Sequence, residues 1–200
     1  LAERVAKLLG VEAKSLVFAG GRIADSTSAA KSVSWKDACA SLGANGVSAS
    51  GAWQGHLAAN GVHGAQAAKV EIDTLTGEVK LLQMVGVQDC GLPLNRLALA
   101  SQINGGMVQA LSYALLEGRV VDPDLGLVLN ANFDDYKIAG CKEIPAMHAI
   151  VDDADERGVI GMAEPAVIPG QSAIANAIHN ACGVRLRELP LTCDKVLMGL

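Results

Sequence analysis

The carboxylate best suited to catalysis is that of Glu164, in the segment 161–165 with the sequence GMAEP. Gly161 and Ala163 are small, so a ligand or another part of the backbone can approach closely. Pro165 fixes its own φ and biases Glu164 towards an extended backbone. The apolar residues around this acid in the sequence are Val159, Ile160, Met162, Val167 and Ile168. Such surroundings would disfavour the charged form, which makes a carboxylate usable as a general base.

A plainer interpretation of Glu164 exists. The segment 171–178, QSAIANAI, places Ile174, Ala177 and Ile178 on one face at helical spacing. An acid shortly before a helix is often placed there by the positive end of the helix dipole. The spacing alone does not choose between a base and a helix-start acid.

A second stretch that could bind a ligand is 101–115, with the sequence SQINGGMVQALSYAL. Its apolar residues recur at helical spacing. Gly105 and Gly106 lie near the expected start of this helix, and each glycine costs about 1 kcal/mol relative to alanine within a helix. Backbone N–H groups at a helix start suit a phosphate, and the Gln102 amide could donate to the same anion. Close packing of another helix against the two glycines is the alternative.

The remaining elements must position these residues. The pattern predicts a hairpin of strands 68–73 and 78–87 around a turn at 74–77, in which Gly77 supplies a positive φ. It also predicts a strand at 143–151 and a long loop at 118–142. Further elements are expected at 1–10 (helix), 16–24 (hairpin), from 35 (helix) and 193–200 (helix).

Composition narrows the classes of function. The chain has 200 residues, of which 50% are hydrophobic and 3% aromatic, with a formal net charge of −5. This charge argues against nucleic acid or an anionic membrane as a partner, and no apolar run reaches the roughly 18 residues of a membrane span. The chain begins without Met, which suggests a piece of a longer protein or a processed subunit.

Cysteine and histidine usage predicts no metal site made by protein side chains. The number of cysteines is five, an odd number, and none forms a CxxC pair, so a disulfide framework or a zinc site is not expected. Reduced thiols are typical of a cytoplasmic protein. His56 and His63 lack a third ligand within range.

Several segments, in order, resemble the C-terminal part of the molybdenum-binding subunit of the xanthine dehydrogenase and aldehyde oxidase family. They span about residues 64–200, and the preceding residues match only loosely. The matching segments are 70–79 (VEIDTLTGEV), 89–91 (DCG) with Asn95, 102–106 (QINGG) with Gln109, 135–138 (DYKI), 161–165 (GMAEP), 175–178 (ANAI), 183–185 (GVR) and 189–192 (LPLT).

The resemblance implies oxidative hydroxylation of a heterocycle or aldehyde, with water as the oxygen source and molybdopterin, alone or as a dinucleotide, as cofactor. Glu164 falls on the family's catalytic glutamate, the general base. Gln102 falls on a glutamine that contacts molybdopterin, with Gly105 and Gly106 at a tight helix start beside it. Gln171 and Ser172 are expected near the phosphate end of the cofactor. The family usually has glycine where Ala163 stands.

The fold expected from the elements and the resemblance is α+β, a mixed β-sheet flanked by helices, as the C-terminal portion of a molybdopterin-binding domain. We expect residues 1–63 to form a helix, a hairpin and a Gly/Ala-rich loop, and residues 64–200 to form the cofactor-binding domain. Iron–sulfur clusters and FAD would lie on partner subunits or domains, together with the other portion of the molybdenum subunit. The isolated chain should be inactive. A non-catalytic assembly module, or a plain anion-binding domain, is the rival expectation.

Overall fold

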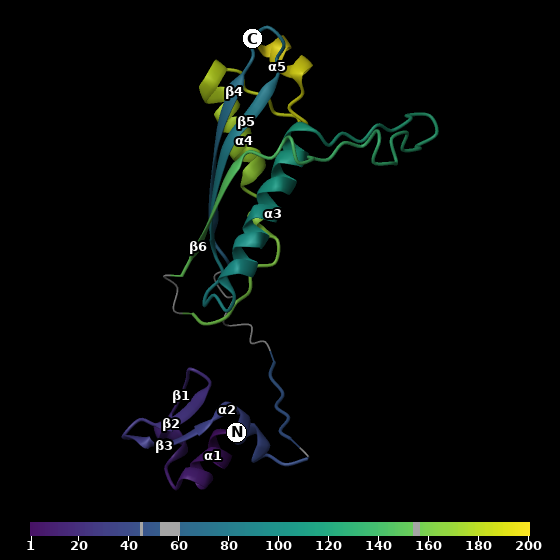
Figure 1. The fold of residues 1–200 in the computed structure, drawn as a ribbon. Coiled ribbons are helices and arrows are strands. Elements are labelled where there is room, and N and C mark those ends of the chain that lie inside the picture. The colour runs from purple at the N-terminus through teal and green to yellow at the C-terminus, as the bar shows by residue number, and fades with distance from the viewer. Residues whose placement is uncertain (45, 53–60, 154–156) are drawn as a thin grey trace. The chain divides into compact units, whose positions relative to one another are not determined.

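The computed structural model describes residues 1–44, 46–52, 61–153 and 157–200 (Figure 1). The chain divides into two compact units, Leu1–Trp53 and Gln54–Leu200. The predicted boundary, between residues 63 and 64, lies ten residues further on. Each unit has its own buried cluster of apolar side chains.

The first unit is a small three-stranded antiparallel sheet with helices. Val5, Ile23 and Ala38 form its buried centre. Gly10 ends the first helix in the left-handed conformation, with φ 63°, and the Ser34 hydroxyl accepts a hydrogen bond from Asp37 N at 3.1 Å at the start of the second. Its elements are α1 (Ala2–Leu9), η1 (Ala13–Ser15), β1 (Leu16–Ala19), β2 (Arg22–Asp25), β3 (Ser28–Ser34) and α2 (Trp35–Ala40). The helices and the β1–β2 hairpin confirm the sequence-based prediction, whereas β3 was not predicted.

The second unit is a three-stranded mixed sheet with helices, which confirms the predicted fold class. The strand order is β4–β5–β6, with β4 antiparallel and β6 parallel to the central strand. Met84, at the middle of β5, pairs with Ala68 on one side and with Met147 on the other. The elements are β4 (Gly64–Ile72), β5 (Val79–Asp89), α3 (Arg96–Leu115), β6 (Ala146–Asp152), η3 (Pro165–Val167), α4 (Gly170–Cys182) and α5 (Cys193–Gly199).

Helices α3 and α4 pack on the sheet and on each other (Figure 1). The core between them is apolar. Its most deeply buried large side chains are Met84, Ile103, Met107, Leu111, Ile174 and Ile178. Full burial of such a side chain stabilises the fold by about 1.5–3 kcal/mol, so this layer holds both helices against the sheet.

Helix α3 begins at Arg96, five residues before the predicted start. Asn95 caps it, with Oδ1 accepting a hydrogen bond from Ala98 N at 3.0 Å. Gly105 and Gly106 therefore lie in the middle of the helix. The prediction that they offer free N–H groups at a helix start is wrong, because those groups belong to the helical hydrogen-bond ladder.

The segment between α3 and β6 leaves the helix and sheet as a long excursion (Figure 1). We call residues 118–142 the arm. Their lack of helix or sheet confirms the predicted loop, apart from the single β-bridge between Val121 and Val128. No helix within the described residues has the length and apolarity needed to cross a membrane.

Candidate functional site

The segment that carries Glu164 is joined to the end of β5. Gly91 and Val159 form an isolated antiparallel bridge, and Leu92 N donates to Gly158 O at 2.7 Å. Arg157 adds an ion pair, with its guanidinium 2.6 Å from the Asp89 carboxylate. The Asp89 side chain is only 6% exposed, and a buried carboxylate is stable in a fold only when it is paired and hydrogen-bonded.

The turn at residues 161–164 is held by Gln102 from α3. The Gln102 amide nitrogen donates to Ala163 O at 2.6 Å. Ala163 has a φ of 47°, the left-handed conformation that alanine adopts only with strain and glycine adopts freely. The glycine expected here from the resemblance would fit this backbone without strain. Gln102 thus contacts the backbone directly before the catalytic candidate.

The short helix η3 rests on Gly106. A Cβ atom added at Gly106 would lie 2.7 Å from the carbonyl carbon of Ala166, so only glycine permits this approach. Gly106 is buried beneath η3 and has a packing role, in place of the expected role beside the cofactor. The alternative of close packing is therefore confirmed at Gly106. Gln66, on β4, donates a hydrogen bond from its amide nitrogen to Ala166 O.

Glu164 itself is exposed, and its surroundings differ from the expected apolar environment. Met162 turns into the core, whereas Glu164 is the residue before η3, with φ −116° and ψ 14° in place of an extended backbone. The Glu164 carbonyl accepts Val167 N at 3.0 Å, which accounts for this compact conformation. Its carboxylate caps nothing and forms no hydrogen bond or ion pair with the described residues. The helix-start interpretation thus lacks its characteristic contact.

The carboxylate lines a cavity of 640 Å³ between α3 and the 164–171 segment. Helix α3 contributes Gln109 and Tyr113, which are four residues apart and therefore lie on one face of the helix, and Glu117 follows just after the end of α3. The lining residues are Gln109, Tyr113, Glu117, Glu164, Pro165, Val167, Ile168 and Gln171. Glu164 therefore shares a cavity with the helix that carries the glycines, as a base acting beside a bound cofactor requires.

Gln171 and Ser172 lie in the first turn of α4. The hydrogen-bond network sets the Gln171 amide so that its nitrogen donates to Val167 O and Ile168 O, at 2.9 Å each. Gln171 thus closes the C-terminal end of η3. Ser172 is exposed, and no side chain caps the start of α4.

Gly105 is the one predicted cofactor residue with an open surface beside Gln102. It is exposed, and a Cβ added there would meet nothing within 4 Å among the described atoms. A flat organic group can lie against helix backbone at such a position. The residues present therefore fit a pterin-like cofactor: a bare helix surface at Gly105, amides at Gln102, Gln109 and Gln171, and an uncommitted carboxylate at Glu164.

Sequence reasoning missed the residues that tether this site from a distance. Gln66 lies two residues before the predicted strand 68–73, and Arg157 follows an acidic run, so neither residue carries a local signal of its contact. Only its spatial position reveals that Arg157 faces Asp89. The other carboxylate oxygen of Asp89 accepts a hydrogen bond from Gly91 N at 2.7 Å, which also stabilises the local turn. Burial, followed by the Asp89 charge, raises the pKa of the Cys90 thiol, which keeps this cysteine unreactive.

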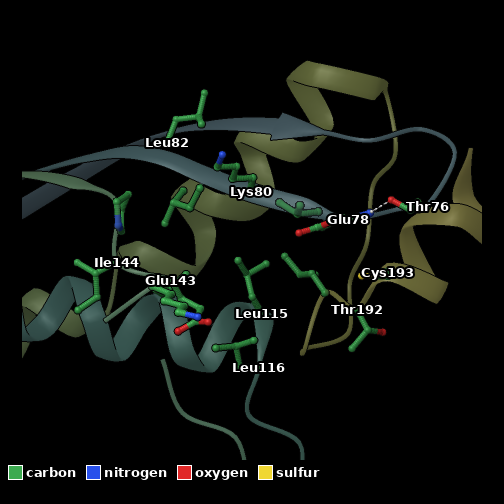
Figure 2. Close-up of a pocket in the computed structure, with 16 residues that line it drawn as sticks. Thr76, Glu78, Lys80, Leu82, Leu115, Leu116, Glu143, Ile144, Thr192 and Cys193 are labelled. Atoms are coloured by element: carbon green, nitrogen blue, oxygen red, sulfur yellow. Dashed lines mark hydrogen bonds between the residues drawn. The ribbon is translucent and has the colours of Figure 1, made fainter. Parts of the chain in front are cut away.

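A larger cavity, of 850 Å³, lies away from Glu164, between the start of β5, the end of α3 and the start of α5. The residues that line this cavity include Glu78, Leu115, Leu116, Thr192 and Cys193 (Figure 2). It contains none of the predicted site residues. Within the described residues, no group of three or more His, Cys, Asp or Glu side chains could hold a metal ion, and His56 lies outside them. None of the five cysteines is paired.

Comparison with known sequences places the chain among molybdenum-binding subunits. The family model for the molybdopterin cofactor-binding domain matches residues 1–145. The chain is 34% identical over 148 residues to the aldehyde oxidoreductase molybdenum-binding subunit PaoC of Escherichia coli K12, covering 72% of this chain and 19% of that protein. It is also 34% identical over 125 residues to the putative xanthine dehydrogenase molybdenum-binding subunit XdhA of the same strain, covering 60% of this chain and 17% of that protein.

Comparison with solved structures finds the same fold in known oxidoreductases. Quinoline 2-oxidoreductase of Pseudomonas putida 86 matches 98% of this chain and 28% of its own, with a TM-score of 0.77 at 22% identity, which supports the fold. The aldehyde oxidoreductase of Desulfovibrio desulfuricans ATCC 27774 matches 70% of this chain and 15% of its own, with a TM-score of 0.62 at 29% identity. The chain spans about a fifth or less of the length of the two curated relatives. It belongs to the molybdopterin cofactor-binding domain family, and it is similar to part of the molybdenum-binding subunits of xanthine and aldehyde oxidoreductases.

Proposed function

We propose that this chain supplies the general base of a molybdenum hydroxylase, with Glu164 as that base. The observation that carries the proposal is a carboxylate without any partner among the described residues, in a cavity, on a turn that three glutamine amides stabilise. A catalytic carboxylate needs a backbone that is held in place and oxygens without another partner, and Glu164 has both among the described residues. A carboxylate that served only the fold would be expected to accept a hydrogen bond.

In this proposal Gln102 has two roles. Its nitrogen fixes the Ala163 carbonyl, while its oxygen is available to the organic part of molybdopterin that lies along Gly105. Ser172 and the first N–H groups of α4 face the phosphate end. Bound molybdopterin would supply the oxidising power for hydroxylation, with water as the oxygen source. Glu164 accepts the proton released from water.

The substrate class is a heterocycle or an aldehyde. We further propose that iron–sulfur and flavin components of the assembly carry the electrons away, and that the protein acts in the cytoplasm, where its five unpaired cysteines would stay reduced. The isolated chain is proposed to be inactive, because it spans only 19% of a relative such as PaoC.

The test is Glu164→Gln in the assembled complex, with turnover measured alongside molybdenum content. Removal of a general base lowers kcat by about 10²–10⁴-fold, and we expect this loss with unchanged metal loading. Glu117→Gln is the matched control: it lines the same cavity, but its carboxylate already accepts the Tyr136 hydroxyl at 2.7 Å. We expect the control to keep turnover within about tenfold of the original.

Near-normal turnover of the Glu164→Gln complex would contradict the catalytic assignment. With molybdenum still bound, that result would favour a module that supports the cofactor held by the rest of the assembly. Loss of molybdenum from the Glu164→Gln complex would instead indicate a binding role for Glu164.

A further inference from the structure

The arm exposes more large apolar side chains than its length would lead one to expect. Phe133 is 79% exposed and Leu127 58% exposed, and Val120, Leu125 and Leu129 are each more than half exposed. Isolated exposed apolar residues are ordinary, but a concentration of them on one segment is typical of a protein interface. The arm therefore has the composition of a buried surface.

The arm is nevertheless an ordered piece of structure. Asp122 N donates to Leu127 O at 2.8 Å and Leu129 N donates to Val120 O at 2.9 Å, which closes a tight loop. Asn130, which is buried, joins the two sides: its oxygen accepts Val120 N at 2.9 Å and its nitrogen donates to Gly118 O at 2.7 Å. These bonds hold the apolar side chains outwards, although free collapse would turn them inwards.

The base of the arm is fixed to α3. The Tyr136 hydroxyl donates to Glu117 at 2.7 Å, and Ala139 N donates to the Ser112 hydroxyl at 2.9 Å. Ser112 is buried in the core, so the arm leaves the domain at a defined place. An interface that is preorganised in this way loses little conformational entropy when its partner binds.

We propose that the arm docks on the portion of the molybdenum-binding subunit that lies outside this chain. Two observations select this occupant. The arm lies inside residues 1–145, the range that matches the family model, so it belongs to the common domain. The quinoline 2-oxidoreductase chain contains the same fold as 28% of a single larger chain, which leaves most of that chain available to cover an apolar surface. The proposal rests on the proposed function, because it takes this chain to work within such a subunit.

The test is site-specific photo-crosslinking in the native cells, with benzoylphenylalanine at position 127 or 133 and cross-linked peptides identified by mass spectrometry. We expect cross-links to a polypeptide region homologous to the molybdenum-binding subunit outside the range of this chain. Leu75 is the matched control, because it is apolar and 89% exposed but lies in the β4–β5 turn. We expect no such cross-link from position 75.

A second variant gives a quantitative readout. Leu127→Ser combined with Phe133→Ser should lower recovery of that subunit region with this chain by about tenfold or more, whereas Leu75→Ser should leave it unchanged. If this chain and that subunit region lie on one polypeptide, the sensitivity of the arm to protease is measured in place of the recovery of the subunit region. Cross-links to a second copy of this chain, cross-links to an unrelated protein, absence of cross-links, or equal cross-linking from position 75 would each overturn the proposal. The readout is peptide identity, so failure of the Glu164 assignment in turnover leaves this result unaffected, and the reverse also holds.

Discussion

Two segments of the second unit have little regular structure, yet they are ordered in opposite ways. The segment 157–171, which carries Glu164, is held by side chains from elsewhere: Gln66, Gln102 and Asp89. It turns Met162 and Ala166 into the core. The arm is held mainly by its own backbone and Asn130, and turns its apolar side chains outwards. Irregular backbone can thus be fixed by side chains from other elements, or by hydrogen bonds within the segment itself.

The substitution with the largest expected effect tests whether the Asp89–Arg157 ion pair holds the Glu164 segment in place. Arg157→Met should destabilise the second unit by about 2–3 kcal/mol, because it leaves the buried Asp89 carboxylate without its cation. This loss is smaller than for a fully buried ion pair, because the Arg157 side chain is 24% exposed and solvent screens its charge. The measurement is urea denaturation followed by circular dichroism.

The control for Arg157 is Arg96→Met, which removes the exposed ion pair with Asp153. Exposed pairs contribute about 0–1 kcal/mol, so this change should be nearly silent. Equal effects of the two substitutions would mean that the Asp89–Arg157 pair does not hold the segment.

An intermediate effect tests the contact between η3 and α3. Gly106→Ala should destabilise the chain by about 1–3 kcal/mol, since its methyl group would overlap the Ala166 backbone. Gly105→Ala, one residue earlier, should stabilise it by up to about 1 kcal/mol, because the site is open and alanine favours the helix. Thermal unfolding of both variants measures the difference.

The same pair sharpens the cofactor assignment. If molybdopterin lies against Gly105, Gly105→Ala should lower molybdenum content in the assembled complex while raising the stability of the chain. A Gly106→Ala variant as stable as the original would contradict the close approach of η3.

The smallest effect concerns the base of the arm. The hydrogen bond to Glu117 raises the pKa of Tyr136 above its usual value of 10.0, and burial and the Glu117 charge act in the same direction. A raised pKa means that this contribution is fully present below the unfolded pKa and is lost as pH rises through the folded pKa. We therefore expect amide hydrogen exchange in the arm to increase at strongly alkaline pH by more than the intrinsic exchange rate of an unprotected amide does.

Tyr136→Phe should give the faster arm exchange already at neutral pH and leave the exchange of the 157–171 segment unchanged. Tyrosinate absorbance assigns the titration, because Tyr113 is the only other tyrosine in the sequence. Equal loosening of both segments by Tyr136→Phe would show that they are not independently ordered.

Much of the fold was predictable, because local residues decide it. The β4–β5 turn follows from Gly77 at φ 74°, and the ends of α1 and α4 follow from Gly10 and Gly183, both left-handed. Strand β3 was missed, since its sequence SAAKSVS lacks an alternating apolar pattern and its pairing with β2 forms it. The α3 start was missed, because two adjacent glycines imitate a helix start while the Asn95 cap lies further upstream.

The candidate site was predictable only in part. Glu164 and Gln102 were found through a resemblance, and their proximity then follows from the fold. Gln66, 100 residues away from the carbonyl it contacts, gives no local signal. The exposed state of Glu164 could not be inferred from its apolar neighbours, because a turn points Met162 and Glu164 in different directions.

The parallel pairing of β5 with β6 has a consequence for the order in which the domain forms. A hairpin such as β4–β5 can close early, but β6 can join β5 only after the whole intervening chain, with α3 and the arm, has been placed. The Glu164 turn follows β6 in sequence, and it is held by α3 through Gln102 while η3 beside it packs on α3 and β4. Formation of the turn that carries Glu164, the proposed base, is therefore a late event, and nascent chains would complete it only after the most sequence-distant contacts have closed.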